Sequence, residues 1–349
     1  MEPLENKRKV PVPTSFCKKR KSTNEKSSNA YRNGRAIIIQ ADAFHIPLKD
    51  ESVQCVVTSP PYFNLRVYKG SNEDAFGREK TIKRYVERTI EILREIRRVL
   101  RPDGVIFWNV GDSYSGSSKG NGGNNAAKKD CGTKAGATHA EVPTKNLCLV
   151  PERIAVAAQD DGWIVRDIII WHKPNCVPES VKDRCTRSYE VILMLTKGKK
   201  YYFNNKAIKE PAVSVPSGKL MPPIGGVKHQ ALGKGNLCGN KVKASATRNK
   251  RNVWSIPTKP HKDAHIAMFP EEIPRLCIKA ASKKGQTVLD PFAGSGTTGI
   301  VAKALGRNVV LLEISSEYVE LIKKRLKYQE PPQVNLGEAL FVPGRLCPV

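Results

Sequence analysis

A short loop, Ser59-Pro60-Pro61-Tyr62, places polar groups directly after an apolar run. The run from Val53 to Thr58 is rich in β-branched residues and ends at the two prolines, which predicts a buried strand that stops at the loop. The Ser59 hydroxyl and the Pro60 carbonyl are hydrogen-bond acceptors, and the prolines restrict the backbone that carries them. Such acceptors can bind the hydrogens of a planar amine and favour a tetrahedral nitrogen. A rigid Pro-Pro turn without a catalytic role is the alternative.

A second loop, 290–298, follows another apolar run and reads Asp-Pro-Phe-Ala-Gly-Ser-Gly-Thr-Thr. Gly294 and Gly296 allow the backbone to approach a ligand closely, and a helix is predicted to begin near Thr297. A Walker loop is excluded because no Lys follows the second glycine, and the dinucleotide fingerprint lacks its third glycine. Glu313 ends the next predicted strand, where a carboxylate can accept both hydroxyls of a ribose. The series indicates a cofactor that contains a nucleoside.

The composition favours a polyanionic partner. The chain has 349 residues with 59 Lys+Arg against 33 Asp+Glu, a formal net charge of +26. Residues 197–262 alone hold 15 Lys/Arg and one acid, Glu210, so the charge is concentrated in an internal segment. A solubilising surface is the alternative. The nine cysteines contain no Cys-x-x-Cys pair and predict no metal site, and no apolar run is long enough to predict a membrane span.

The predicted elements alternate between strands and helices along most of the chain. A strand is expected at 36–39, a helix at 81–100, a strand at 105–110, a helix from Pro151, and strands at 164–171 and 191–195. Residues 270–326 read helix, strand, loop, helix, strand, helix. This alternation predicts an α/β fold in which helices cover both faces of a mostly parallel sheet.

Together the two loops resemble the signatures of the DNA amino-methyltransferases, and the resemblance extends over about residues 35–328. The Ser-Pro-Pro-Tyr motif precedes the glycine motif, with the basic segment between them, as in the permuted β group of that family. Further stretches, 112–114, 171–175 and 265–270, are similar as well. The resemblance implies a Rossmann-like fold that depends on S-adenosylmethionine, with an inserted target-recognition segment.

What the family resemblance implies is a base flipped out of the duplex and methylated on its exocyclic amine. The catalytic residues would be Ser59, Pro60, Pro61 and Tyr62. Asp42 would lie near the adenine of the cofactor, Asp290 by its methionine moiety and Glu313 on its ribose. The other residues that would line the cofactor are Phe292, Gly294, Ser295, Gly296 and Thr297.

Serine at the first motif position favours the N4 amine of cytosine in this family, so we expect a cytosine-N4-specific DNA methyltransferase. Adenine-N6 methylation is the first alternative. A catalytically inactive nucleic-acid-binding protein on the same fold is an alternative of another class. Methylation at C5 of cytosine is disfavoured, because it needs a nucleophilic thiol, usually in a Pro-Cys pair, and the chain contains none.

Five segments are expected. They are a disordered basic tail (1–34), a catalytic half (35–200), a target-recognition insertion (201–262), a cofactor-binding half (263–328) and a C-terminal tail (329–349). The densest basic cluster lies in the insertion and is expected to contact DNA phosphates, which position a duplex without reading its sequence. Its members are Lys241, Lys243, Arg248, Lys250 and Arg251.

Double-stranded DNA is the expected partner, although the basic segment does not distinguish DNA from RNA. The sequence leaves open whether the protein is a monomer or a homodimer. Two basic clusters, Lys7–Lys9 and Lys18–Lys21, resemble a bipartite nuclear import signal. An arm that contacts DNA phosphate is the alternative, with a cytoplasmic or nucleoid location.

Overall fold

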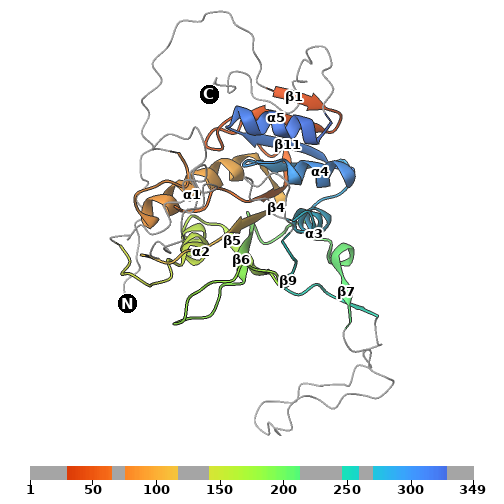
Figure 1. Cartoon of the computed structure of the whole chain (residues 1–349). Coiled ribbons are helices and arrows are strands. Elements are labelled where there is room, and N and C mark those ends of the chain that lie inside the picture. The colour runs from red at the N-terminus through yellow and green to blue at the C-terminus, as the bar shows by residue number, and fades with distance from the viewer. Residues whose placement is uncertain (1–29, 65–74, 117–140, 213–245, 259–269, 328–349) are drawn as a thin grey trace, which may run out of the picture.

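The computed structural model describes residues 30–64, 75–116, 141–212, 246–258 and 270–327 (Figure 1). These residues form a nine-stranded sheet in the order β1-β2-β11-β10-β3-β4-β6-β5-β9 and a small pair, β7-β8. The strands are β1 (Ala30–Asn33), β2 (Ala36–Gln40), β3 (Val53–Thr58), β4 (Leu100–Val110), β5 (Ile164–His172), β6 (Tyr189–Thr196), β7 (Glu210–Pro211), β8 (Thr247–Arg248), β9 (Val253–Ser255), β10 (Thr287–Asp290) and β11 (Asn308–Glu313). The helices are α1 (Ile82–Val99), α2 (Val150–Asp160), η2 (Asn205–Ile208), α3 (Glu272–Ala281), α4 (Thr297–Ala304) and α5 (Ser316–Arg325).

Five neighbouring strands, β2, β11, β10, β3 and β4, are parallel and form the centre of the sheet. Beyond β4, strand β6 is antiparallel to both β4 and β5. The late strands β10 and β11 lie between the early strands β2 and β3. The two predicted halves therefore share one sheet, and the prediction of an α/β fold with a mostly parallel sheet is confirmed.

Helices cover both faces of this sheet (Figure 1). In β11, Val310 and Leu312 join the hydrophobic cluster that contains α1 and α2. Val309 and Leu311 point to the other face and join the cluster with α3, α4 and α5. A strand with two buried faces has a continuous apolar sequence, which is why β11 could be predicted from the sequence. No helix in the described ranges is long and apolar enough to cross a membrane.

Most predicted elements are found close to their expected bounds. The helix expected at 81–100 is α1, and Thr81 caps it by accepting a hydrogen bond from the Arg84 amide. One strand begins earlier than expected, because β4 starts at Leu100 rather than at Val105. Its register against β3 jumps from Val53–Leu100 to Cys55–Val105, so residues 101–104 bulge out of the ladder. The turn residues Pro102, Asp103 and Gly104 therefore lie inside β4.

Two expected segment boundaries need correction. The tail expected to be disordered up to residue 34 ends in strand β1, which pairs antiparallel with β2. The insertion expected at 201–262 returns to the main sheet, because β9 pairs in parallel with β5 and Trp254 is buried. Strands of three or four residues give little periodic signal, so the sequence pattern did not reveal them. The tail at 329–349 lies outside the described residues.

Candidate active site

The predicted site residues converge on one edge of the sheet. Parallel strands present their carboxyl ends on the same side, and the loops after them are the usual place for a ligand. Here the carboxyl ends of four parallel strands and the segments that follow them contribute the predicted residues. Asp42 follows β2, Glu313 ends β11, residues 290–297 extend from the end of β10 to the start of α4, and residues 59–62 follow β3. The end of β4 contributes Asn109. The fold thus unites residues that are more than 200 positions apart in the sequence.

The predicted catalytic loop, residues 59–62, is held by a network of hydroxyl, amide and carboxylate groups. Ser59 Oγ lies 3.2 Å from Tyr62 Oη, and Asn109 Nδ2 lies 3.2 Å from Ser59 Oγ and 2.8 Å from Tyr62 Oη. Tyr62 Oη donates to Glu190 Oε2 at 2.5 Å. Burial, together with the neighbouring Glu190 carboxylate, raises the pKa of the Tyr62 phenol well above its usual range. The phenol therefore stays protonated and acts as a donor.

Two glycines allow the loop to pack closely. A Cβ at Gly111 would lie 2.7 Å from the Tyr62 ring, so only glycine permits the ring to lie against the end of β4. Gly77 has φ +94° and a Cβ there would lie 2.8 Å from Pro61 Cβ. Tyr85 Oη donates to the Pro61 carbonyl at 2.9 Å. The proline segment is thus held from helix α1 as well as from the sheet.

Asp290 is buried at the start of the predicted cofactor loop, residues 290–298, and both of its carboxylate oxygens accept hydrogen bonds from the protein. Its Oδ1 accepts from Thr58 Oγ1 at 2.7 Å and from the Phe292 amide at 3.2 Å. Its Oδ2 accepts from Thr298 Oγ1 at 2.6 Å. Burial raises the pKa of Asp290 to about 6, and the hydrogen bonds from Thr298 and Thr58 oppose that shift. Asp290 therefore joins the strand of the catalytic loop to the first turn of α4.

Glu313 holds the loop from the neighbouring strand. Its Oε2 accepts from the Gly294 amide at 2.8 Å and its Oε1 from the Ser315 amide at 3.0 Å. Burial raises the pKa of Glu313 to about 7. Each carboxylate oxygen has a further lone pair that can accept a ribose hydroxyl. Gly294 has φ +50°, and a Cβ there would meet only the Phe292 carbonyl, at 4.0 Å, so the backbone is open to a ligand. These residues fit a nucleoside cofactor.

The other side chains of this loop are half-buried or buried. Phe292 stacks on Phe76 with ring centroids 5.6 Å apart and meets the edge of Trp108 at 6.1 Å. Ser295 and Thr297 are buried and lie 3.3 Å apart through their hydroxyls. Their side chains therefore support the turn from within. Gly294 is half-buried, whereas Gly296 is buried and lies against Ile322 of α5.

Asp42 lies at the flank of the same edge. It follows β2 and accepts from the Phe44 amide at 3.1 Å, which forms a local turn. The Ala41 amide donates to the Glu313 carbonyl at 3.2 Å. Asp42 is therefore next to the segment that carries the expected ribose acceptor, as an acid near an adenine would be.

The expected DNA-contacting cluster is only partly described. Lys241 and Lys243 lie outside the described residues. Arg248, Lys250 and Arg251 all pair with Glu210, at 2.8, 3.2 and 3.2 Å. Arg251 is the most exposed of the three, with 63% of its side chain accessible. Glu210, the one acid of the basic segment, therefore forms ion pairs with three of the cations expected to contact DNA.

Sequence reasoning missed the partners of the catalytic loop: Asn109, Lys173 and Glu190. Asn109 carried a signal, since it is a polar residue within an otherwise apolar run and is 2% exposed. Its Oδ1 is buried with no partner in the described part of the chain. Trp108, Trp171 and Trp254 are buried in the core.

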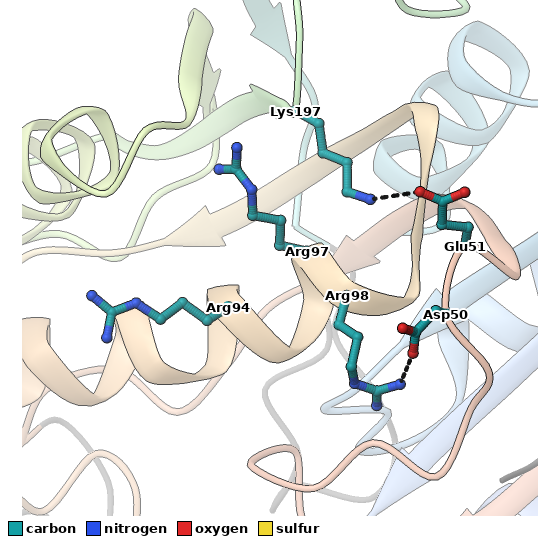
Figure 2. Close-up of a pocket in the computed structure, with 6 residues that line it drawn as sticks. All are labelled: Asp50, Glu51, Arg94, Arg97, Arg98 and Lys197. Carbon is teal, nitrogen blue, oxygen red and sulfur yellow. Dashed lines mark hydrogen bonds and ion pairs between the residues drawn. The ribbon is translucent and has the colours of Figure 1, made fainter. Parts of the chain in front are cut away.

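A charged hollow is found at the opposite edge of the sheet (Figure 2). It is lined by residues that precede β3, end α1 or follow β6, namely Asp50, Glu51, Arg94, Arg97, Arg98 and Lys197. Two of its cations face acids: Arg98 Nη1 lies 2.7 Å from Asp50 and Lys197 Nζ lies 3.9 Å from Glu51. The hollow is at the amino ends of the strands and is not part of the candidate active site.

Comparison with known proteins shows the family of the chain. The family model described as DNA methylase matches residues 53–324. The type II methyltransferase M.SmaI of Serratia marcescens is 41% identical over 285 residues, which cover 80% of this chain and 86% of that protein. M.Cfr9I of Citrobacter freundii is 38% identical over 310 residues, which cover 87% and 92% respectively. Both matches span nearly the whole relative.

Solved structures share the fold. The PvuII DNA methyltransferase (cytosine-N4-specific) aligns with a TM-score of 0.58 at 17% identity, over 89% of this chain and 92% of that one. A Thermus thermophilus protein assigned as a DNA modification methylase, complexed with S-adenosyl-L-methionine, aligns with a TM-score of 0.50 at 23% identity, over 83% and 92%. The chain therefore belongs to the DNA methylase family, whose members are S-adenosylmethionine-dependent DNA methyltransferases.

Proposed function

We propose that this DNA methyltransferase acts on the exocyclic N4 amine of cytosine in double-stranded DNA. The observation that carries the base assignment is Ser59, a neutral hydroxyl at the first position of the catalytic motif, within hydrogen-bond distance of Tyr62 and Asn109. The likeness to the PvuII enzyme supports the fold and not the base, because its identity is only 17%.

The geometry suits a planar amine that must become nucleophilic. The lone pair of an exocyclic amine is delocalised into the ring, so the amine attacks only when its hydrogens are held out of the base plane. The Ser59 hydroxyl and the Pro60 carbonyl are the two acceptors proposed for those hydrogens. The base first leaves the helical stack, which costs a few kcal/mol, and the Tyr62 ring offers a surface for stacking. Two prolines and the packing of the loop keep reorganisation small.

The methyl donor is S-adenosylmethionine, which supplies an electrophilic methyl group on a sulfonium. Glu313 would bind the ribose hydroxyls, and Gly294 and Gly296 would let the loop backbone approach the cofactor. Phe292 would pack against it, and Asp42 would lie near its adenine. Asp290 has all its near partners within the protein, so we propose that it supports the loop from below the methionine end.

The base assignment is tested by mass spectrometry of nucleosides from DNA that the enzyme has methylated. We expect N4-methylcytosine, and the Ser59→Ala variant serves as the control that should yield little product. N6-methyladenine would overturn the cytosine assignment in favour of the first alternative. Binding of cofactor and DNA without any methylated nucleoside would instead favour a catalytically inactive binding protein.

The DNA path is proposed to include the basic segment at about 201–262. Replacing Arg248, Lys250 and Arg251 together by Ala should weaken binding to all DNA sequences and flatten the salt dependence by up to about 0.9 log unit per lost contact. Glu210→Gln is the matched variant, because it frees the same cations and should strengthen binding. Unchanged affinity and salt slope in the triple variant would move the DNA path elsewhere. Cofactor affinity should not change in either variant.

The basic clusters Lys7–Lys9 and Lys18–Lys21 lie outside the described residues. The relatives reported above come from bacteria, which favours a DNA-contacting arm over nuclear import for these clusters. Deleting residues 1–29 should then weaken DNA binding modestly and leave the rate of methyl transfer at saturating DNA intact. A deletion variant with wild-type DNA affinity would remove this role.

A further inference from the structure

Glu190 lies outside both sequence motifs and yet contacts the catalytic loop. It is at the start of β6, opposite Trp171 of β5 in the ladder. Its Oε2 accepts from Tyr62 Oη at 2.5 Å and from Asn109 Nδ2 at 3.0 Å. Only 16% of its side chain is exposed. Because the carboxylate lies this close to the hydroxyls of the catalytic loop, it determines where their hydrogens point.

The hydrogens of this network can be assigned by counting donors. A carboxylate only accepts, so the single hydroxyl hydrogen of Tyr62 points to Glu190. Tyr62 Oη can then only accept on its other side, so the Ser59 hydroxyl donates to it across 3.2 Å. The two hydrogens of Asn109 Nδ2 are shared among Tyr62 Oη at 2.8 Å, Glu190 Oε2 at 3.0 Å and Ser59 Oγ at 3.2 Å. Even with Asn109 donating to Ser59 Oγ, one lone pair of that oxygen remains for the hydrogen of a substrate amine. The donors run in one direction, from Ser59 through Tyr62 to Glu190.

Amine methylation requires a proton acceptor. When the amine lone pair forms the new N–C bond, the electron pair of the broken S–C bond stays on sulfur and the nitrogen becomes positively charged. The product is neutral only after one N–H proton has left. A serine hydroxyl is a weak base by itself. It can accept that proton if it passes its own hydrogen on at the same time.

We propose that Glu190 is the end of a proton relay that serves the methylated amine. The N–H proton passes to Ser59 Oγ, the Ser59 hydrogen passes to Tyr62 Oη, and the Tyr62 hydrogen passes to Glu190 Oε2. Ser59 and Tyr62 end as they began, Glu190 ends as a carboxylic acid, and nothing is oxidised or reduced. Glu190 does not touch the substrate, so it is a positioning residue that acts through Tyr62.

Lys173 supports this role from the next strand. Its ammonium contacts Glu190 Oε1 and lies 4.4 Å from the centroid of the Trp171 ring. Lys173 and Tyr62 are the titratable groups that the described residues place against Glu190. This ion pair holds the Glu190 carboxylate in place beside Tyr62.

The test is Glu190→Gln in the full-length enzyme, measured by transfer of a labelled methyl group from S-adenosylmethionine to DNA in a single turnover. Glutamine can accept a hydrogen bond from Tyr62 but cannot take its proton. We expect the rate constant to fall by about 100-fold or more at saturating cofactor and DNA, with both affinities unchanged. Glu320→Gln, which removes an exposed carboxylate paired with Lys323 on α5, is the control.

Tyr62→Phe provides a second, independent break in the relay, because it keeps the ring and removes the hydroxyl. If Tyr62 and Glu190 act in series, the double variant is no slower than the slower single variant. Losses that multiply, or a Glu190→Gln enzyme with the wild-type rate, would overturn the relay. The inference rests on DNA amine methylation and not on cytosine, so a product identified as N6-methyladenine would reject the proposed base and leave this test intact.

Discussion

The two loops of the active site are built on adjacent parallel strands but are held in different ways. The cofactor loop after β10 is held by carboxylates at the ends of its own and the next strand, Asp290 and Glu313, which bind its backbone and its threonine. The catalytic loop after β3 is held through its side chains by Asn109 and Glu190, from strands on its far side. The residues that hold the cofactor loop are close to it in the sequence, whereas those that hold the hydroxyls of the catalytic loop are far from it in the sequence.

The sharpest separation of the two loops is expected from Ser59→Ala. The change removes the acceptor proposed for the substrate amine and the first member of the proposed hydroxyl relay, and it leaves the cofactor loop untouched. We expect turnover to fall by about 100-fold, while the dissociation constant for S-adenosylmethionine stays the same. Steady-state kinetics together with calorimetry would measure both. Wild-type turnover in this variant would remove Ser59 from the chemistry.

The difference between the loops also explains what the sequence could predict. The cofactor loop is a local pattern, since its glycines, Asp290 and Glu313 lie within 24 residues of each other. Its position, the strand before it and the helix after it were all found as expected. Glu190 lies 128 positions from Tyr62, and only the pairing of β4 with β6 brings it there. A single sequence does not give the order or register of strands, so Glu190 and Lys173 could not be assigned to the site.

The converse variant, Glu313→Ala, should damage the cofactor loop alone. It removes the charged acceptor proposed for the ribose and the partner of the Gly294 amide. We expect a loss of about 1.5–3 kcal/mol in binding of S-adenosylmethionine, equal to about one to two decades in affinity. Turnover at saturating cofactor should be largely retained. A dissociation constant equal to that of the wild type would show that the ribose lies elsewhere.

The pH dependence of cofactor binding should sharpen the same assignment. Burial raises the pKa of Glu313 to about 7, so in the cofactor-free enzyme the carboxylate proposed to accept the two ribose hydroxyls forms only as the pH rises through 7. Affinity for S-adenosylmethionine should therefore rise up to about tenfold between about pH 6 and pH 8. The Glu313→Gln variant should bind weakly at both values without this rise. A wild-type affinity that falls over this interval would contradict the assignment.

The smallest effect is expected from Thr58→Val, which cuts the contact between the two loops. Thr58 ends the strand of the catalytic loop, and its hydroxyl donates to the buried carboxylate of Asp290 at 2.7 Å. Losing that donor should lower the free energy of unfolding by about 1 kcal/mol at neutral pH. Burial raises the pKa of Asp290 from 3.8 in the unfolded chain to about 6 in the folded protein. Between pH 3.8 and about pH 6, Asp290 is therefore more protonated in the folded than in the unfolded state. The free energy of unfolding falls as the pH rises through this interval. The hydroxyl stabilises the ionised form, so the cost of the variant should be larger at about pH 8 than at about pH 5.

Denaturant unfolding of the cofactor-free protein at the two pH values would measure this difference. Thr58→Ser is the control, because it keeps the hydroxyl and should retain most of the stability. Thr298→Val removes the other threonine donor to Asp290, at 2.6 Å, but from the cofactor side. If the loops are held separately, Thr298→Val should weaken cofactor binding while Thr58→Val affects mainly turnover. If both variants lost cofactor binding and turnover equally, Asp290 would couple the two loops into one functional unit. The two loops would then differ in which residues hold them but not in function.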